Sequence, residues 1–303
     1  MTRRYEGRAL PRPDDEVVDQ GLAFDLGTLG RRGMLRALGL GAVALGAAAC
    51  GSGAPGTAAT ATPDPATGLT EIPDETGGPY PADGTNGANV LTETGVVRSD
   101  IRSSFGTSTT TAPGVPTTLE LTVLDVARGG APFAGTAVYV WHCDRSGDYS
   151  MYSDAIRTEN YLRGVQIADA RGVVRFTSVF PACYSGRWPH VHFEVYPDQA
   201  GITDHGTCLA TSQIALPKPT CDAVYATAGY ESSIGNLADV SLTDDNVFGD
   251  DGGAHQLAAV TGDVTAGFAV GLTVPVDTRT APSAGAPPAG GGGPGGPGGP
   301  PRR

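Results

Sequence analysis

The chain has 303 residues, enough for a domain with a substantial core, and it carries 20 basic and 32 acidic side chains. A formal net charge of −12, with Lys218 as the one lysine, excludes the basic surface that nucleic-acid binding requires. We therefore expect no nucleic-acid partner.

Residues 1–49 predict an export signal. Arg31 and Arg32 precede a Gly- and Ala-rich apolar stretch that is too short for a permanent membrane anchor. Paired arginines before such a stretch indicate Tat export, with an ordinary Sec signal peptide as the alternative. Residues 47–51 read Ala-Ala-Ala-Cys-Gly and predict lipidation of Cys50. We expect a cell-surface lipoprotein held to the membrane by a lipid anchor, with cleavage and secretion as the alternative.

Two segments lack the apolar residues that a core requires. Residues 50–68 consist mainly of Ala, Thr, Pro and Gly and predict a disordered tether. Residues 277–303 are rich in Pro and Gly and predict a disordered tail. The folded domain is therefore expected over residues 69–276.

The domain begins with an irregular stretch, residues 71–102. It contains Thr-Gly-Gly-Pro-Tyr at residues 76–80 and the pair Asn86-Gly87, so turn formers are too frequent for a helix or a central strand. A polar segment of this length is expected to lie over another part of the domain.

Short apolar or alternating runs follow, bounded by Gly, Pro, Asp and Asn, with no long amphipathic helix between them. This pattern predicts an all-β fold, a β-sandwich of mixed or antiparallel strands with long active-site loops. The acidic stretch 217–263 is interpreted as a solvated loop, because its Asp spacing does not fit an EF-hand calcium loop. The expected strands are residues 119–126, 137–143, 165–168, 173–179, 189–195, 212–216 and 264–274.

Four cysteines lie in the predicted domain: Cys143, Cys183, Cys208 and Cys221. An even number in an exported chain predicts two disulfides, for which three pairings exist. We expect Cys143 to pair with Cys183 and Cys208 with Cys221, the second pair closing a short loop that contains proline. A thiolate metal site is the alternative, and the absence of Cys-x-x-Cys spacing disfavours it.

His190 and His192 lie in the predicted strand 189–195 and alternate with apolar residues. Because strand side chains alternate between faces, the two imidazoles point the same way, while Val191 and Phe193 pack into a core behind them. Two imidazoles on one face form half of a metal site; the alternative is two polar residues on a solvated strand.

The loop before this strand carries a phenol and a guanidinium. Pro181, Gly186 and Pro189 force the chain to turn, which is expected to bring Tyr184 and Arg187 back over the two imidazoles. These residues alone leave two alternatives, a metal site and a solvated strand face.

Four separated motifs occur in one order. Residues 141–150 read Trp-His-Cys-Asp-Arg-Ser-Gly-Asp-Tyr-Ser, followed by Leu-Arg-Gly at 162–164, Pro-x-x-Tyr at 181–184 and Arg-x-Pro-His-x-His at 187–192. Together they resemble the intradiol ring-cleavage dioxygenases, the ferric catechol and protocatechuate dioxygenases. The resemblance extends from residue 72 to residue 216.

The resemblance implies a non-haem Fe(III) ion bound by Tyr149, Tyr184, His190 and His192. Two phenolates and two neutral imidazoles form a hard, anionic ligand set that favours Fe(III) over Fe(II). The implied enzyme is an oxidoreductase that cleaves a catechol-type aromatic between its two hydroxylated carbons. It incorporates both atoms of O2 and gives cis,cis-muconate-type products.

The same resemblance assigns roles to the other matched residues. Tyr184 is expected to leave the metal and accept a substrate proton, and Arg187 to stabilise negative charge that develops in the reaction. Gln213 matches a glutamine on the next strand that contributes to catalysis. The residues expected to line the substrate mouth, besides Arg187, are Thr76, Gly78, Pro79 and Tyr80.

Neighbouring polar residues receive other assignments. Tyr152 is the alternative to Tyr149, but the Gly-x-Tyr-Ser match falls on Tyr149. Trp141 is interpreted as a core residue and His142 as a non-ligand on the opposite strand face. Glu194 shares the face of the two histidines and is either a support for the ligands or a surface carboxylate.

Two further histidines, His205 and His255, lie in predicted loops and receive no role. The helical N-terminal dimerisation region of the cytoplasmic catechol enzymes is absent, so a homodimer remains one alternative to a monomer. The loop between Tyr184 and His190 is shorter than in those enzymes, which opens the site. Two other functions compete: a non-catalytic surface lipoprotein whose sandwich binds a sugar or an aromatic ligand, and a His-x-His copper or zinc protein.

Overall fold

The computed structural model describes residues 4–5, 8–9 and 68–282. Two short antiparallel strands, β1 (Arg4–Tyr5) and β2 (Arg8–Ala9), fall in the predicted export signal. The rest of the predicted signal, Cys50, most of the tether and most of the tail lie outside the described residues. Among the described residues, no helix has the length and apolar character needed to cross a membrane.

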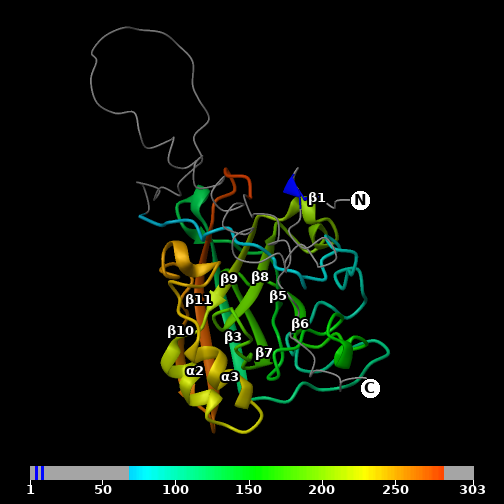
Figure 1. Ribbon diagram of the computed structural model, residues 1–303. Helices are drawn as coiled ribbons and strands as arrows, with labels where there is room; N and C mark the ends of the chain where they lie inside the picture. The colour runs from blue at the N-terminus through cyan, green and yellow to red at the C-terminus, as the bar shows by residue number, and fades with distance from the viewer. Residues whose placement is uncertain (1–3, 6–7, 10–67, 283–303) are drawn as a thin grey trace, which may run out of the picture. The chain divides into compact units, whose positions relative to one another are not determined.

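Two β-sheets form the domain (Figure 1), which confirms the predicted β-sandwich. The first sheet has the strand order β10-β11-β3-β4, and β7 also pairs with β3. The β11–β3 pair is parallel and the other pairs are antiparallel, so this sheet is mixed. Its strands are β3 (Pro116–Asp125), β4 (Ala131–Pro132), β7 (Val173–Val179), β10 (Ala259–Asp263) and β11 (Gly267–Val276).

The second sheet is antiparallel, in the order β6-β5-β8-β9. In its register Trp141 lies opposite His192, and His192 lies opposite Gln213, so these three side chains share one face. The strands are β5 (Ala137–Trp141), β6 (Arg163–Ile167), β8 (His190–Tyr196) and β9 (Ala210–Ala215).

The main core lies between the two sheets. Val191 and Phe193 of β8 point into it and pack in one cluster with residues of the first sheet such as Leu121 and Phe176. The alternation predicted for β8 is therefore correct: the apolar residues face the core, and His190 and His192 face the other way.

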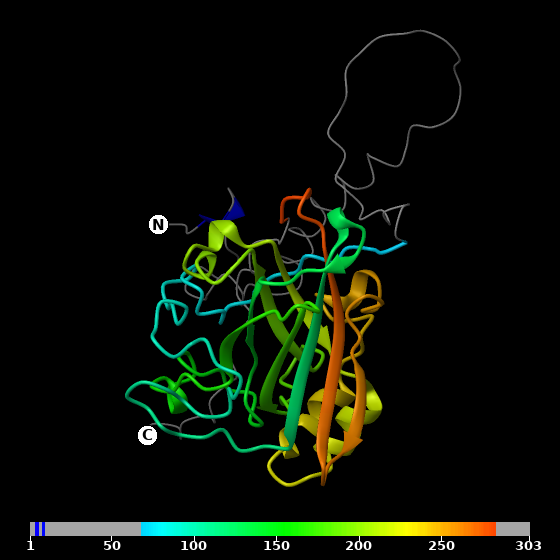
Figure 2. The same cartoon turned by 180° about the vertical axis from the view of Figure 1, so that it is seen from behind.

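A second cluster covers the outer face of the β6-β5-β8-β9 sheet. It contains Tyr139 and Trp141 of β5 together with Ala82 and Val90 from the irregular stretch after residue 68. This stretch, coloured cyan in Figures 1 and 2, runs alongside β5 and β6. It is the expected polar segment lying over another part of the domain, and it explains why every residue of β8 is buried.

The stretch 217–263 was expected to be a solvated loop, and this prediction was wrong: Val247 and Phe248 are buried in the core, and residues 259–263 form β10. It contains α2 (Lys218–Tyr225) and α3 (Glu231–Ala238), which lie near one end of β3 and β11 in Figures 1 and 2. Helix α2 buries Cys221, Val224 and Tyr225, which are three and four residues apart. Eight residues are too few for this period to stand out in the sequence.

The last predicted strand, 264–274, is the second arm of a hairpin. Strand β10 precedes it, and the Asp263 carboxylate accepts hydrogen bonds from the backbone N–H groups of Thr265 and Ala266 at 2.8 and 2.9 Å, which closes the turn. Short 3-10 helices connect other elements: Val126–Arg128, Asp154–Ile156, Gly201–Thr203, His205–Thr207 and Phe248–Asp250.

The two ends of the domain meet. The backbone N–H of Ile72 donates to the carbonyl of Pro275 at 2.8 Å, and the Glu71 carboxylate accepts from the backbone N–H of Asp277 at 3.0 Å and from the Thr280 hydroxyl at 2.8 Å. These contacts fix the beginning of the domain against the end of β11.

The predicted disulfides are not formed: all four cysteines of the domain are buried free thiols. Cys208 precedes the six-residue strand β9, whereas Cys221 follows it in α2, so about 20 Å of strand separates them. Cys143 and Cys183 each contact a backbone carbonyl, at 3.7 Å (Ala182) and 3.5 Å (Arg187), instead of each other. The predicted Cys208–Cys221 pair was wrong because a strand lies between the two thiols, although the two residues are close in sequence.

Candidate metal centre

His190 and His192 lie side by side on the outer face of β8. Their Nε2 atoms are 3.1 Å apart, and the rings meet at an interplanar angle of 85°. The His190 Nδ1 lies 2.5 Å from the carbonyl oxygen of Trp188 and donates to it, which leaves Nε2 with a free lone pair. The His192 ring stacks on Trp141 with centroids 4.8 Å apart, and the described residues offer its buried Nδ1 no hydrogen-bond partner.

Burial keeps both imidazoles neutral. Desolvation lowers the pKa of His190 and of His192 well below the usual histidine value, and the positive charge of Arg187 acts in the same direction. Two neutral imidazoles with converging Nε2 atoms are the form in which histidine binds a metal ion.

Tyr149 and Tyr184 complete the group. The Tyr184 hydroxyl lies 3.1 Å from the His190 Nε2, the Tyr149 hydroxyl lies 3.5 Å from the same atom, and the two hydroxyls are 3.4 Å apart. Gly147 has a φ of +92°, and a Cβ at this position would lie 3.3 Å from the Tyr184 Cβ. The glycine of the Gly-x-Tyr motif therefore lets the two tyrosines approach each other.

The donor atoms suit a metal ion. The two phenol oxygens and the His190 Nε2 are 3.1 to 3.5 Å apart, and the His192 Nε2 lies 3.1 Å from that of His190; ligands bound at about 2.0–2.2 Å to a first-row transition ion are spaced in this way. Burial raises the pKa of both phenols, so a bound cation would be needed to keep them ionised at neutral pH. Two phenolates with two imidazoles match a hard ion such as Fe(III). That these four residues bind iron stays a prediction.

Arg187 lies beside this group in a buried ion pair. Its Nε donates to the Asp245 Oδ2 at 2.9 Å, and its NH2 donates to the Gln213 Oε1 at 2.7 Å. The side chains of Arg187 and Asp245 are 14% and 0% exposed. Burial works against both charges, but the partner lowers the pKa of Asp245 and, together with the nearby phenols, raises the pKa of Arg187. A fixed positive charge therefore adjoins the predicted metal ligands.

Comparison with known proteins relates this arrangement to a family. Residues 97–201 match the family model described as Dioxygenase. An intradiol ring-cleavage dioxygenase from Tetranychus urticae has a TM-score of 0.53 and 21% identity, over 69% of this chain and 95% of that one. The domain has the intradiol dioxygenase fold. The resemblance found in the motifs is thereby confirmed.

Two curated relatives match shorter parts of this intradiol-type domain. A chlorocatechol 1,2-dioxygenase of Pseudomonas sp. (strain P51) is 37% identical over 87 residues, which is 23% of this chain and 34% of the relative. A catechol 1,2-dioxygenase of Pseudomonas sp. (strain EST1001) is 42% identical over 55 residues, 18% of each protein. The chain thus spans about a third or less of the length of these curated relatives.

The family match contains the four predicted ligands and Arg187 but ends before Gln213 and Asp245. Asp245 was missed in the sequence, where it belonged to a stretch interpreted as a solvated loop. Its carboxylate also accepts backbone N–H groups of Trp188, at 2.6 Å, and Val247, at 2.9 Å. A single sequence does not indicate that an aspartate will pair with an arginine 58 residues away.

The segment expected at the substrate mouth of the intradiol-type domain borders the metal ligands. The Thr76 carbonyl accepts from the Gln213 Nε2 at 2.9 Å, and the Tyr80 ring lies 5.1 Å from the Tyr149 ring. Gly78 has a φ of +72°, and a Cβ there would lie 3.3 Å from the His192 Cε1. Pro79 is exposed, and its carbonyl accepts from the Asn86 amide at 2.7 Å. Their contacts with substrate remain predictions.

Arg163 supports the site through buried hydrogen bonds. Apart from the Leu-Arg-Gly match, nothing in the sequence indicated this role. It is only 1% exposed. Its guanidinium donates to the Ser150 hydroxyl and carbonyl, each at 3.0 Å, to the Pro81 carbonyl at 3.0 Å and to the Tyr139 hydroxyl at 3.1 Å. Arg163 thereby connects Ser150, the residue after Tyr149, to β5 and to the irregular stretch after residue 68.

Residues assigned to other roles lie outside the ligand group. The Tyr152 hydroxyl donates to the Asn86 Oδ1 at 2.7 Å, and the His142 Nε2 lies 2.7 Å from the Ser178 hydroxyl. Glu194 is completely buried, so it is not a surface carboxylate. His205, to which the sequence assigned nothing, lies 3.5 Å from the Glu194 Oε1.

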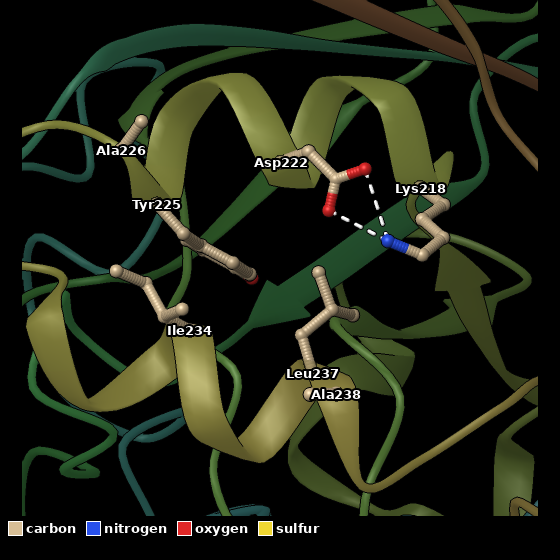
Figure 3. Close-up of a pocket in the computed structure, with 7 residues that line it drawn as sticks. All are labelled: Lys218, Asp222, Tyr225, Ala226, Ile234, Leu237 and Ala238. Atoms are coloured by element: carbon tan, nitrogen blue, oxygen red, sulfur yellow. Dashed lines mark hydrogen bonds and ion pairs between the residues drawn. The ribbon is translucent and has the colours of Figure 1, made fainter.

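A pocket of about 320 Å³ lies elsewhere, between α2 and α3 (Figure 3). Lys218 and Asp222 pair at 2.7 Å on one side of it, and Leu237 and the exposed Ile234 form the other side. It shares no residue with the ligand group.

Proposed function

We propose that this protein is an exported, non-haem Fe(III) intradiol dioxygenase that cleaves a catechol-type aromatic between its hydroxylated carbons with O2. The observation that carries the proposal is the convergence of two tyrosine oxygens on the His190 Nε2 at 3.1 and 3.5 Å, with the His192 Nε2 3.1 Å from the same atom, next to the Arg187 guanidinium. A site for binding a sugar or an aromatic ring alone has no need of four converging metal ligands.

Bound Fe(III) would supply a Lewis acid that accepts electron density from a catechol and so makes the catechol reactive toward O2. The surrounding side chains divide the remaining tasks. Tyr149 is 2% exposed, whereas Tyr184 is only partly buried and is followed by the exposed Ser185 and Gly186. Tyr184 is therefore the phenol that can move aside, and its oxygen is placed to take a proton from an entering catechol.

Arg187 would stabilise the negative charge of the catecholate and of the opened ring. Asp245 and Gln213 hold its guanidinium at 2.9 and 2.7 Å, so the charge is oriented before substrate arrives. The His190 ring is oriented in the same way by the Trp188 carbonyl.

Colour tests the metal centre directly. Full-length protein reconstituted with Fe(III) is expected to show a broad tyrosinate-to-iron absorption band that shifts to longer wavelength when catechol is added without O2. Tyr149→Phe should weaken or shift the band, and Tyr152→Phe, the matched control three residues later, should keep it. A protein that stays colourless with iron would refute the dioxygenase and favour a binding module.

Export by Tat and lipidation of Cys50 are the second part of the proposal, and the sequence of residues 1–50 supports them. Membrane association should be lost in Cys50→Ser, and Arg31→Lys with Arg32→Lys should keep the protein in the cytoplasm. Membrane association that persists in Cys50→Ser would contradict lipid anchoring, and export that persists in the double lysine variant would contradict Tat.

A further inference from the structure

A second group of metal-binding side chains lies on the same outer face of β8, beyond His192. Glu194 follows His192 by two residues, so its carboxylate lies about 7 Å farther along the strand. Asp83 and His205 join it, and the three ligand atoms lie within 4.8 Å of one another. Asp83 and Glu194 are 3% and 0% exposed.

The spacing of these atoms is too long for hydrogen bonds of normal strength but suits a shared ion. The His205 Nε2 lies 3.6 Å from the Asp83 Oδ2 and 3.5 Å from the Glu194 Oε1. Nitrogen and oxygen ligands at 2.0–2.2 Å from a tetrahedral zinc ion are about 3.3–3.6 Å apart. The two separations therefore match a tetrahedral ion better than a direct contact.

Each carboxylate is held by the oxygen that does not face His205. The Asp83 Oδ1 accepts from the Thr85 N–H at 2.9 Å and the Thr85 hydroxyl at 2.6 Å, and the Glu194 Oε2 accepts from the Tyr196 hydroxyl at 2.8 Å. The Glu194 Oε1 is buried and has no hydrogen-bond partner among the described residues. A buried carboxylate oxygen without a hydrogen bond is costly unless a cation, either the paired His205 or a bound metal ion, neutralises it.

One histidine cannot neutralise two ionised carboxyl groups. Two carboxyl groups, those of Asp83 and Glu194, face one imidazole, which supplies at most a single positive charge. The Arg163 guanidinium is engaged with Ser150, Pro81 and Tyr139 instead. A divalent ion would balance both carboxylates.

The group is separate from the tyrosine–histidine centre. The Trp141 ring stacks on His192 at 4.8 Å, and the Tyr139 ring stacks on Trp141 at 4.9 Å on the side toward Glu194, which lies opposite Tyr139 in the β5–β8 register. The two aromatic rings therefore lie side by side on β5, Trp141 opposite His192 and Tyr139 opposite Glu194.

We propose that Asp83, Glu194 and His205 bind a divalent ion of the zinc type. The His205 side chain is 42% exposed, so the ion can enter from solvent and keep a water molecule as its fourth ligand. The ion connects the turn after residue 82 with strand β8 and the 3-10 helix His205–Thr207, which lie more than 100 residues later in the sequence. The ion holds the irregular stretch after residue 68 against the outer face of the sheet. This site does not depend on the proposed function.

Crystals of the full-length protein, first loaded with Fe(III) and then soaked with zinc chloride, test the site. Anomalous difference maps from data above and below the zinc edge should show zinc between Asp83, Glu194 and His205, at a position distinct from any metal bound by the tyrosine–histidine group. Metal analysis after dialysis should give one zinc equivalent that is lost in His205→Asn and Glu194→Gln and kept in His255→Asn, the exposed control.

Thermal unfolding checks that the variants fold. Zinc should raise the Tm of the wild type and of His255→Asn but not of His205→Asn, whose partly exposed side chain can be changed without disturbing the core. Absence of anomalous density at the three residues, or an unchanged zinc content in His205→Asn, would overturn the proposal. Zinc density only at the tyrosine–histidine group would overturn it as well and would leave the dioxygenase proposal to its own test.

Discussion

Arg187 and Asp245 form a buried ion pair whose Nε and Oδ2 atoms are 2.9 Å apart, although 58 residues separate them. Arg187 comes from the loop before β8 and Asp245 from the segment after α3, so the pair joins these two segments beside the metal ligands. Because the pair is shielded from solvent, each residue depends on the other for neutralisation.

The first prediction concerns this pair. Arg187→Gln and Asp245→Asn should each lower the free energy of unfolding by about 3 kcal/mol, because each leaves a buried charge without its partner. The double variant should lose less than the sum of the two. Urea unfolding of the four proteins measures this coupling. Removing the exposed pair in Lys218→Ala should change the free energy by less than about 1 kcal/mol, and additive effects at Arg187 and Asp245 would contradict the prediction.

A second prediction uses two glycines with positive φ. Gly78→Ala and Gly87→Ala should both strain the backbone and cost about 1 kcal/mol of stability. Only the Gly78 substitution places a Cβ 3.3 Å from the His192 Cε1; around Gly87 a Cβ would meet nothing within 4 Å. Iron affinity, measured by titration with a competing chelator, should therefore fall at least tenfold in Gly78→Ala and stay unchanged in Gly87→Ala. Equal losses of iron affinity in the two variants would show that a Cβ at residue 78 does not displace His192.

The third prediction is a loss of stability in acid that depends on His142. Burial lowers the pKa of His142 to about 4, so the unfolded chain binds its proton more readily than the folded one. The contribution of His142 is present above pH 6.5 and is lost as the pH falls from about 6.5 to about 4. His142→Gln should remove about 3 kcal/mol of this pH dependence, measured by urea unfolding at a series of pH values across this range. Parallel pH profiles for the wild type and His142→Gln would contradict it.

The fourth prediction has the opposite sign. Burial raises the pKa of Glu75 to about 8, with the negative charge of Asp250 adding to the effect, so the folded protein holds the proton. Its contribution is present below about pH 4.5 and is lost as the pH rises to about 8. Relative to the wild type, Glu75→Gln should gain stability over this range, by at most about 2 kcal/mol because Glu75 is partly solvated. The exposed Glu93→Gln is the control, and an identical gain there would refute the assignment.

The fifth prediction concerns the thiols. Burial raises the pKa of Cys183 and of Cys208 to about 12, so both should resist a thiol reagent in the folded protein. A Cys50→Ser variant unfolded in guanidinium without reductant should expose four reactive thiols, and added reductant should not increase this number. Two or fewer thiols before reduction would restore the disulfide hypothesis.

The sequence predicted the parts of the site that depend on local pattern. Alternation in β8 placed His190 and His192 on one face because a strand has a fixed period of two. The turn-forming residues before β8 predicted that Tyr184 lies over the two imidazoles. Tyr149 was identified through the resemblance of the Gly-x-Tyr motif to the intradiol dioxygenases.

Other parts depend on contacts between distant segments. Asp245 and Asp83 are ordinary acidic residues in turn-rich stretches, and only folding places one beside Arg187 and the other beside His205. The disulfide prediction failed for a related reason: Cys208 and Cys221 are close in sequence, but β9 holds them apart. Helices α2 and α3 have eight residues each, which is too short for a periodic signal.

The parallel pairing of β11 with β3 sets the order in which the first sheet can form. Strand β3 pairs along one edge with β7, about 60 residues later. Its other edge pairs with β11, the last strand of the domain. A ribosome must therefore release almost all of residues 116–276 before that edge is covered, and contacts of such sequence separation form slowly. Until then a nascent chain exposes an apolar strand edge, which makes this interval the step at which aggregation competes with folding.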